Sequence, residues 1–323
     1  MNSSNASTVT THPATNIIAA AYLCSAALSF IGNIALFYPI VYHKALRSRK
    51  QYIVLAGLAF ADAMNMGAFV FAAIYRFVMG SVVEQAATVN KIGYTAFVCA
   101  LLPHNFTWNL FYMTAGLVLI SVGVDRLLVT VATMWYLAQG PNLAYILGPV
   151  GIPYGHGVLF TLFVLFYAAV FWERELDDSM CWQYDTMTDQ VMEYQVNVFT
   201  YSNLLSILVV VVMLIAYFYH NKKVAAQQGH EVRGSTVKHQ KEMTRKVAWS
   251  TLATFILVVV PTFIQTEFGP LLPSTLRVAL FVPGNLNPLY NVYLFLIKTP
   301  RMRKALRNAL KRKKMSVNLS DWK

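Results

Sequence analysis

Residues 110–126 read LFYMTAGLVLISVGVDR, an apolar run that ends in an adjacent acid and base, Asp125 and Arg126. These two are the only formal charges in the 81 residues from 92 to 172. A helix needs about 20 apolar residues to cross a bilayer core, and a charge held at membrane depth costs several kcal/mol unless it is paired or hydrated. The stretch therefore predicts a transmembrane helix whose terminal charge pair has a function.

The rest of the chain has the composition of a polytopic membrane protein. It has 323 residues, of which 57% are hydrophobic and 12% charged, and this is too apolar for a soluble domain of its length. The apolar runs are continuous and do not alternate, which favours helices over barrel strands. We predict an all-α membrane protein, a seven-transmembrane helix bundle. The expected spans lie near 16–42, 51–76, 93–127, 143–172, 195–220, 244–267 and 275–297.

The basic residues gather on one side of these spans. Of the 26 Lys and Arg residues, 22 lie in segments 43–50, 221–246 and 298–323 or at Arg126. This side is cytoplasmic by the positive-inside rule, so the N-terminus is expected outside the cell and the protein in the plasma membrane. Because the basic runs flank membrane spans, the net charge of +12 indicates attraction to the anionic inner leaflet of the lipid bilayer and to a cytoplasmic partner. A nucleic-acid partner is not expected.

The two ends of the chain are expected to lie outside the bundle. Residues 1–15 read as a polar extracellular tail with glycosylation sequons at Asn2 and Asn5. The seven-span region covers 16–297, and its first span is expected to act as an uncleaved insertion signal. The remainder, 298–323, contains RMRKALRNALKRKK, a pattern typical of a short amphipathic helix on the cytoplasmic membrane surface.

Short motifs occur on the spans in a definite order. They are Gly32-Asn33, LAFAD ending in Asp62, Asp125-Arg126 with Tyr136 ten residues later, FILVVVP from Phe255 to Pro261, and NPLY from Asn287. Along almost the whole chain this order resembles the rhodopsin-like (class A) G-protein-coupled receptors. LAFAD, HNFTWNL and DRLLVTV are also similar to nematode chemoreceptor-type serpentine receptors. The resemblance implies a receptor that binds an extracellular ligand, a chemosensory small molecule or peptide, and activates a heterotrimeric G protein.

The resemblance assigns Arg126 to the floor of the cavity that opens for the G protein. Asp125 would hold the planar guanidinium while its fork stays able to swing onto other acceptors. The alternative is a snorkelling arginine that only anchors the third span. The acid that commonly restrains this arginine from the sixth span is replaced by Lys241, with Glu242 one residue away. We therefore expect high activity without ligand.

Two prolines in the spans are expected to act as hinges, because proline removes a helix hydrogen bond. The family's tryptophan two residues before Pro261 is Val259 here, so the aromatic switch is expected at Phe255 or Phe263. The family's tyrosine three residues after Pro288 is Asn291, which leaves Tyr290 and Tyr293 as candidate partners of the arginine. The residues expected in coupling and activation are Asp125, Arg126, Tyr136, Phe255, Pro261, Asn287, Pro288 and Tyr290.

Asp62 is a second charge at membrane depth and has no basic neighbour in its own span. A lone buried carboxylate should bind a cation, bond to Asn33 and Asn287, or take up a proton. The family uses this cluster as a sodium site. However, Ala115 stands where a hydroxyl is usual and Pro283 where another ligand is common. A structural, water-filled polar cluster is therefore favoured over sodium binding.

The chain has three cysteines. The resemblance implies a disulfide between Cys99 and Cys181, and Cys24, inside the first span, is expected to be a buried apolar residue. Cys99 lies 27 residues before Arg126, about two more than is usual in the family, so we expect an irregular start to the third span.

The ligand pocket is less clearly marked. Trp108 stands where amine receptors have an aspartate and Phe281 where opsins have a lysine, which disfavours monoamines and retinal. His104, Trp108 and Tyr112 share one helix face, for ligand contact or for packing. The two outer arginines, Arg76 and Arg277, could bind a carboxylate or phosphate, but pairing with Glu267 and with acids of the second outer loop is favoured. The candidate pocket residues are Arg76, His104, Trp108, Tyr112, Phe263, Arg277 and Phe281.

Other functional classes have little support in the sequence. No metalloprotease, phosphate-loop or serine-nucleophile motif occurs, so no enzyme activity, metal or cofactor is expected. The rival class is a polytopic transporter or channel, which would need polar groups along a midplane path and usually repeated halves.

Overall fold

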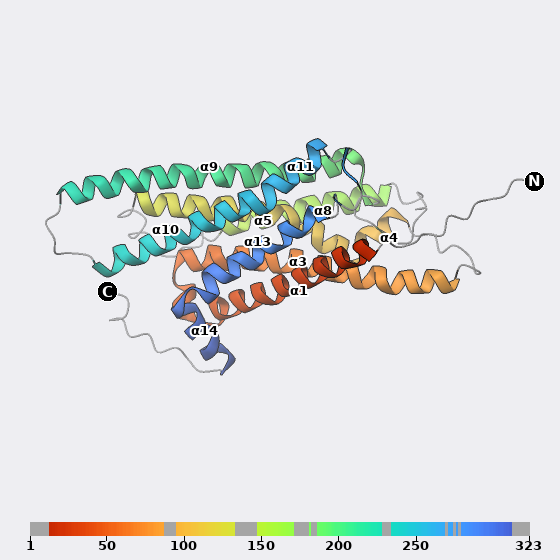
Figure 1. Cartoon of the computed structure of the whole chain (residues 1–323), viewed down its shortest axis with the longest axis horizontal. Coiled ribbons are helices and arrows are strands. Elements are labelled where there is room, and N and C mark those ends of the chain that lie inside the picture. Colours follow the sequence, from red (N-terminus) through yellow and green to blue (C-terminus); the bar gives the residue numbers. More distant parts are fainter. Residues whose placement is uncertain are drawn as a thin grey trace, which may run out of the picture.

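The computed structural model describes residues 13–86, 95–132, 147–170, 181, 186–227, 234–268, 271–273, 276 and 279–311. These residues form an elongated bundle of long helices, and successive spans run in opposite directions (Figure 1). The bundle has an Arg126 end, where α5 finishes, and a disulfide end, where α5 begins. The predicted all-α fold is confirmed.

Among the described residues, six helical stretches are long and apolar enough to cross a membrane. The first three spans are α1 (Pro13–Tyr42), α3 (Lys50–Ala86) and α5 (Pro103–Val131). The fourth span is a π-helical turn (Leu147–Gly151) followed by α8 (Ile152–Val170), and the fifth is α9 (Asp189–Gln227). The sixth span consists of α10 (Gly234–Thr254), a π-helical turn (Phe255–Val259) and α11 (Val260–Phe268). The seventh span consists of α13 (Phe281–Val292) and a π-helical turn (Tyr293–Ile297). The π-helical turn of the sixth span ends two residues before Pro261, so the predicted hinge has an irregular backbone beside it.

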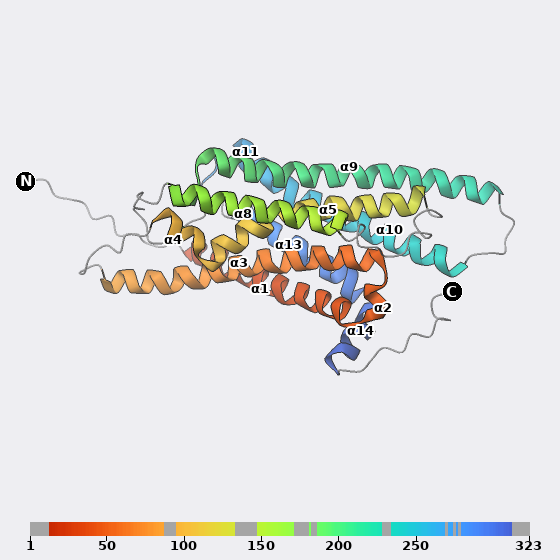
Figure 2. The ribbon, with the colours of Figure 1, turned by 180° about the vertical axis from the view of Figure 1, so that it is seen from behind.

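Three short helices lie at the ends of the bundle: α2 (Lys44–Arg47), α4 (Ala96–Leu101) and α14 (Pro300–Leu310). α14 turns away from the bundle axis at the Arg126 end (Figures 1 and 2). Its apolar face is buried through Met302, Ala305 and Ala309. The His43 ring nitrogen Nε2 lies 2.9 Å from the carbonyl oxygen of Ala305, which fixes α14 to the end of α1.

α5 lies at the centre of the bundle and packs against α3, α8 and α9. Its closest approach to α8 is at Gly157. A Cβ atom there would lie closer to the Leu110 carbonyl oxygen and to the Thr114 Oγ1 than van der Waals contact allows. Glycine at 157 therefore sets the spacing of the third and fourth spans.

The third span starts irregularly, as its spacing predicts. α4 ends at Leu101 and α5 begins at Pro103, so the helix is interrupted one turn after Cys99. The expected Cys99–Cys181 disulfide is present, with the two Cα atoms 5.2 Å apart. The amide of Asn105 donates to the carbonyl oxygens of both cysteines, at 2.9 and 3.1 Å. The interruption thus brings a polar side chain against the disulfide.

The expectation for Cys24 is wrong. Its side chain is exposed on the outer surface of α1 and is a free thiol. In a membrane such a position faces lipid, where an apolar side chain is as stable as in the core.

Candidate functional site

Arg126 and Asp125 are both buried at the end of α5, with 4% and 3% of their surface exposed. Arg126 Nε donates to Asp125 Oδ2 at 2.8 Å, and Nη2 bonds the same oxygen. The remaining nitrogen, Nη1, donates to Gln51 Oε1 on α3 at 3.2 Å. The acid therefore neutralises the guanidinium, and a neighbouring span fixes its direction.

A small cavity adjoins this pair where four elements converge. Its volume is about 10 Å³, which is room for about one water. The lining residues are Gln51, Val54 and Leu55 from α3, Val122, Asp125 and Arg126 from α5, Val247 from α10, and Phe295 from the π-helical turn of the seventh span. The guanidinium is therefore packed between spans and is not open to bulk water.

The sixth span carries Lys241 and Glu242, the two positions considered for a restraint on Arg126. The side chain of Lys241 lies outside the described residues. Glu242 Oε1 accepts a hydrogen bond from Lys246 Nζ, one helical turn later, at 2.6 Å. Lys246 Nζ also donates to Thr299 Oγ1 at 2.7 Å, at the start of α14. The sixth span is thus linked to the segment that follows the seventh span.

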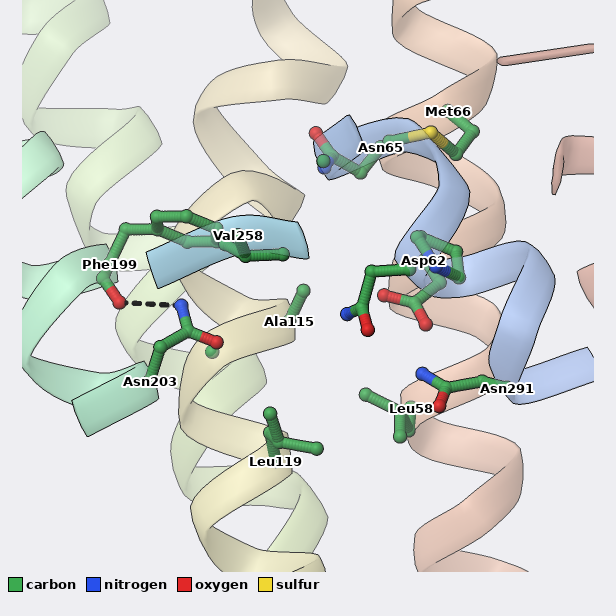
Figure 3. Close-up of a pocket in the computed structure, with 14 residues that line it drawn as sticks. Leu58, Asp62, Asn65, Met66, Ala115, Leu119, Phe199, Asn203, Val258 and Asn291 are labelled. Atoms are coloured by element: carbon green, nitrogen blue, oxygen red, sulfur yellow. Dashed lines mark hydrogen bonds between the residues drawn. The ribbon is translucent and has the colours of Figure 1, made fainter. Parts of the chain in front are cut away.

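A larger cavity lies around Asp62 in the middle of the bundle (Figure 3). Its volume is about 50 Å³, against about 10–15 Å³ for one water. The lining residues are Leu58, Asp62, Asn65, Met66, Ala115, Gly116, Leu119, Phe199, Asn203, Val258, Gly284, Asn287, Pro288 and Asn291. Asp62 is only 7% exposed, and its Oδ2 has no hydrogen-bond partner among the residues that the structure describes. The cavity can therefore hold water or a small cation against this oxygen.

The polar cluster differs from the expected trio of Asp62, Asn33 and Asn287. Asp62 and Asn287 line the same cavity, but Asn33 is not among its lining residues and donates to the Ser29 carbonyl oxygen at 2.9 Å. Asn291 takes the third place: it lines the same cavity, and its side chain points towards Asp62 from α13 (Figure 3).

The sixth and seventh spans are joined by two side-chain hydrogen bonds beside this cluster. Thr254 Oγ1 donates to Asn287 Oδ1 at 3.1 Å, and Ser250 Oγ donates to Asn291 Oδ1. The asparagine that stands at the family's tyrosine position therefore belongs to the polar core.

The candidate switch residues of the sixth span lie elsewhere than expected. Phe255 is 42% exposed and Phe263 is 57% exposed, so both side chains face outward from the bundle. This geometry does not fit an aromatic switch at either residue. It does not fit a place for Phe263 in the ligand pocket either. Val259, at the tryptophan position, is buried, as is Pro261. A π-helical turn spans Phe255–Val259, directly before α11, which carries Pro261 and Phe263.

The two candidate tyrosines of the seventh span, Tyr290 and Tyr293, differ in how far they are buried. Tyr290 is partly buried against the apolar core at the Arg126 end. Tyr293 is 39% exposed, and the Lys298 ammonium lies 5.3 Å from the centre of its ring. Of the two side chains, Tyr290 is therefore the one packed inside the bundle. Tyr136 lies outside the described residues.

The expected aromatic face of α5 is present at the disulfide end and is used for contacts between spans. His104 packs against Tyr75, and Trp108 against Phe69, with ring centres 5.0 and 4.8 Å apart. Tyr112 stacks on Phe199 of α9 at 4.3 Å. These contacts favour the packing interpretation. The side chains of Arg76 and Phe281, the whole of Arg277, and the sequons at Asn2 and Asn5 lie outside the described residues.

Sequence reasoning missed several of the polar groups that hold this site. They are Gln51, Asn203, Lys246, Ser250, Thr254 and Thr299. The available signal was their polarity within or beside apolar spans, since polar side chains at membrane depth face the interior of the bundle.

No curated protein matches the chain. The family model described as 7 transmembrane receptor (rhodopsin family) matches residues 32–282, well over half of the chain. The matched segment contains Asp62, the Arg126 pair, the disulfide and Pro261. The chain therefore belongs to the rhodopsin family of seven-transmembrane receptors, the G-protein-coupled receptors.

Proposed function

We propose that this receptor binds an extracellular ligand near its disulfide end and activates a heterotrimeric G protein at its Arg126 end. The observation that carries the proposal is the buried Arg126, held by Asp125 and Gln51 beside a cavity that four elements share. A guanidinium in such a place can exchange its restraining partners for others when the spans separate, since its donors are fixed in a planar fork. Tyr290 is the proposed alternative partner.

The distribution of charge supports this orientation. The Arg126 end carries the exposed basic residues Lys44, Arg47, Arg303, Lys304 and Arg307. By the positive-inside rule this end is cytoplasmic, and it would adjoin the anionic inner leaflet of the plasma membrane. The disulfide end would then face the oxidising exterior. The N-terminal tail, with its sequons at Asn2 and Asn5, would lie there too.

The proposed ligand is a chemosensory small molecule or a short peptide. Support comes from the sequence resemblance to nematode chemoreceptor-type receptors and from Trp108 and Phe281 at positions that amine receptors and opsins fill with charged residues. Arg76 and Arg277 remain proposed contacts for an anionic group on the ligand. Because His104, Trp108 and Tyr112 pack against other spans, we place the ligand beside this aromatic face.

Replacing the arginine tests the proposal. Arg126→Ala should reach the cell surface but fail to stimulate nucleotide exchange on a panel of purified G proteins. Arg126→Lys should also be impaired because the bidentate fork is lost. Arg245→Ala is the matched control, since Arg245 is exposed on α10. Unchanged exchange by an equally expressed Arg126→Ala receptor would refute the assignment.

A transporter or channel is the rival function, and the cavity at Asp62 is the observation that favours it. A deep carboxyl beside space for water is a feature of ion paths. The two functions separate in reconstituted vesicles. A receptor stimulates nucleotide exchange without moving solute, whereas a transporter gives ion flux that Asp62→Asn abolishes.

A further inference from the structure

Lys246 is a buried cation whose two partners lie on different parts of the bundle. It is only 6% exposed. Glu242 lies one turn earlier on the same helix, α10, with its Oε1 2.6 Å from Lys246 Nζ. Thr299 lies immediately before α14, with its Oγ1 2.7 Å from the same nitrogen. One ammonium group therefore bridges the sixth span and the start of α14.

The Thr299 end of this bridge is well fixed. Thr299 is 6% exposed, and its hydroxyl donates to the Leu294 carbonyl oxygen at 3.3 Å while it accepts from Lys246. The helix that follows is held by its buried apolar face and by the contact between His43 and Ala305. Movement of α10 would therefore separate Lys246 from Thr299, because Thr299 is held in place by the rest of the bundle.

The two partners of Lys246 respond differently to such movement. Glu242 is carried on the same helix, so its contact with Lys246 persists wherever α10 goes. The contact with Thr299 exists only while the Arg126 end of α10 lies against the start of α14. Only an interaction that differs between two states shifts the equilibrium between them. The Thr299 contact is therefore the part of the bridge that distinguishes a closed from an open sixth span.

We propose that Lys246 is a tether that holds the sixth span closed against the start of α14, and that breaking its contact with Thr299 is part of receptor activation. The activation role rests on the proposed function; the closed contact itself does not. Arg126 is held by groups on the third and second spans, and Lys246 supplies a separate restraint on the sixth. High ligand-free activity is expected because Lys241 replaces the acid that usually restrains the arginine. The tether would lower that activity.

The test measures the distance between the sixth span and the start of the second span, and it needs no G protein. Spin labels are attached at Ser48→Cys and Arg245→Cys, both exposed at the Arg126 end, in a Cys24→Ala background that keeps the disulfide. Lys246→Met and Thr299→Val should each increase the population with the longer distance about two- to tenfold, and tenfold corresponds to about 1.4 kcal/mol. Their double mutant should change the population no further, because both remove one contact.

Three further variants of the labelled receptor make the result specific. Thr299→Ser keeps an acceptor oxygen and should match the parent, which guards against misfolding of the valine variant. Glu242→Ala should change the distance less than Lys246→Met does. Lys304→Met, at an exposed lysine of α14, should have no effect. Unchanged distances in Lys246→Met and Thr299→Val, or additive changes in the double mutant, would overturn the tether.

Nucleotide exchange, measured in parallel, separates the two proposals. If exchange rises with the open population, both the tether and the coupling role stand. If the distances shift as expected while no variant, including the parent, stimulates any G protein, the tether stands and the proposed function fails.

Discussion

Replacement of Gly157 by alanine should destabilise the receptor, although the same change elsewhere in a helix usually stabilises it. Elsewhere in a helix, glycine to alanine is favourable by about 0.5–1 kcal/mol. At 157 the added methyl would overlap the Leu110 carbonyl oxygen and the Thr114 Oγ1. The first of these is backbone and cannot turn away, so α8 must move from α5. Overpacking of this kind costs about 1–3 kcal/mol, which corresponds to a fall in the unfolding midpoint of about 1–5 °C for a chain of this size.

The matched control is Gly155→Ala on the same helix, where an added Cβ would meet nothing within 4 Å. Its midpoint should equal that of the parent or rise. The assay is the fraction of purified receptor that stays monodisperse in detergent after heating. Thr114→Ala should not rescue Gly157→Ala, because the clash with the Leu110 backbone persists. An equal midpoint for Gly157→Ala and Gly155→Ala would refute the assigned packing of α5 on α8.

Three further predictions concern the disulfide and the Arg126 end. Cys99→Ser and Cys181→Ser should reduce surface expression equally, and the double mutant should be no worse, since each removes one covalent link; additive losses would contradict the pairing. Lys241→Glu should lower ligand-free nucleotide exchange about two- to fivefold by supplying an acid near the arginine, whereas Glu242→Ala should do little. A sharp rise for Glu242→Ala alone would identify Glu242 as the restraint. Gln51→Leu should raise ligand-free exchange about two- to tenfold, the equivalent of one hydrogen bond of about 0.5–1.5 kcal/mol, and no rise would show that Asp125 alone is enough.

Hydropathy predicted the spans well because crossing a bilayer demands a long apolar helix whatever the rest of the sequence does. It could not predict which way a side chain faces within a span. In a membrane, apolar groups are stable both in the core and against lipid. This is why Cys24, Phe255 and Phe263 were placed wrongly, although their spans were right.

The spacing of the family's motifs predicted which positions lie near the site. It did not predict which side chains each residue contacts. Asp62 and Asn287 share a cavity as expected, yet Asn291 replaces Asn33 there. The substitution of asparagine for the family's tyrosine was visible in the sequence, but the sequence alone does not show that residue 291 faces the cavity around Asp62.

The contact of Asn105 with both cysteine carbonyl oxygens bears on the order in which the receptor matures. One amide can hold the backbones of residues 99 and 181 together before any sulfur is oxidised, and so raises the local concentration of one thiol beside the other. We expect oxidation to make permanent an arrangement that these hydrogen bonds favour beforehand. For the same reason, we expect residue 181 to stay hydrogen-bonded to Asn105 of α5 after a reducing agent cleaves the disulfide.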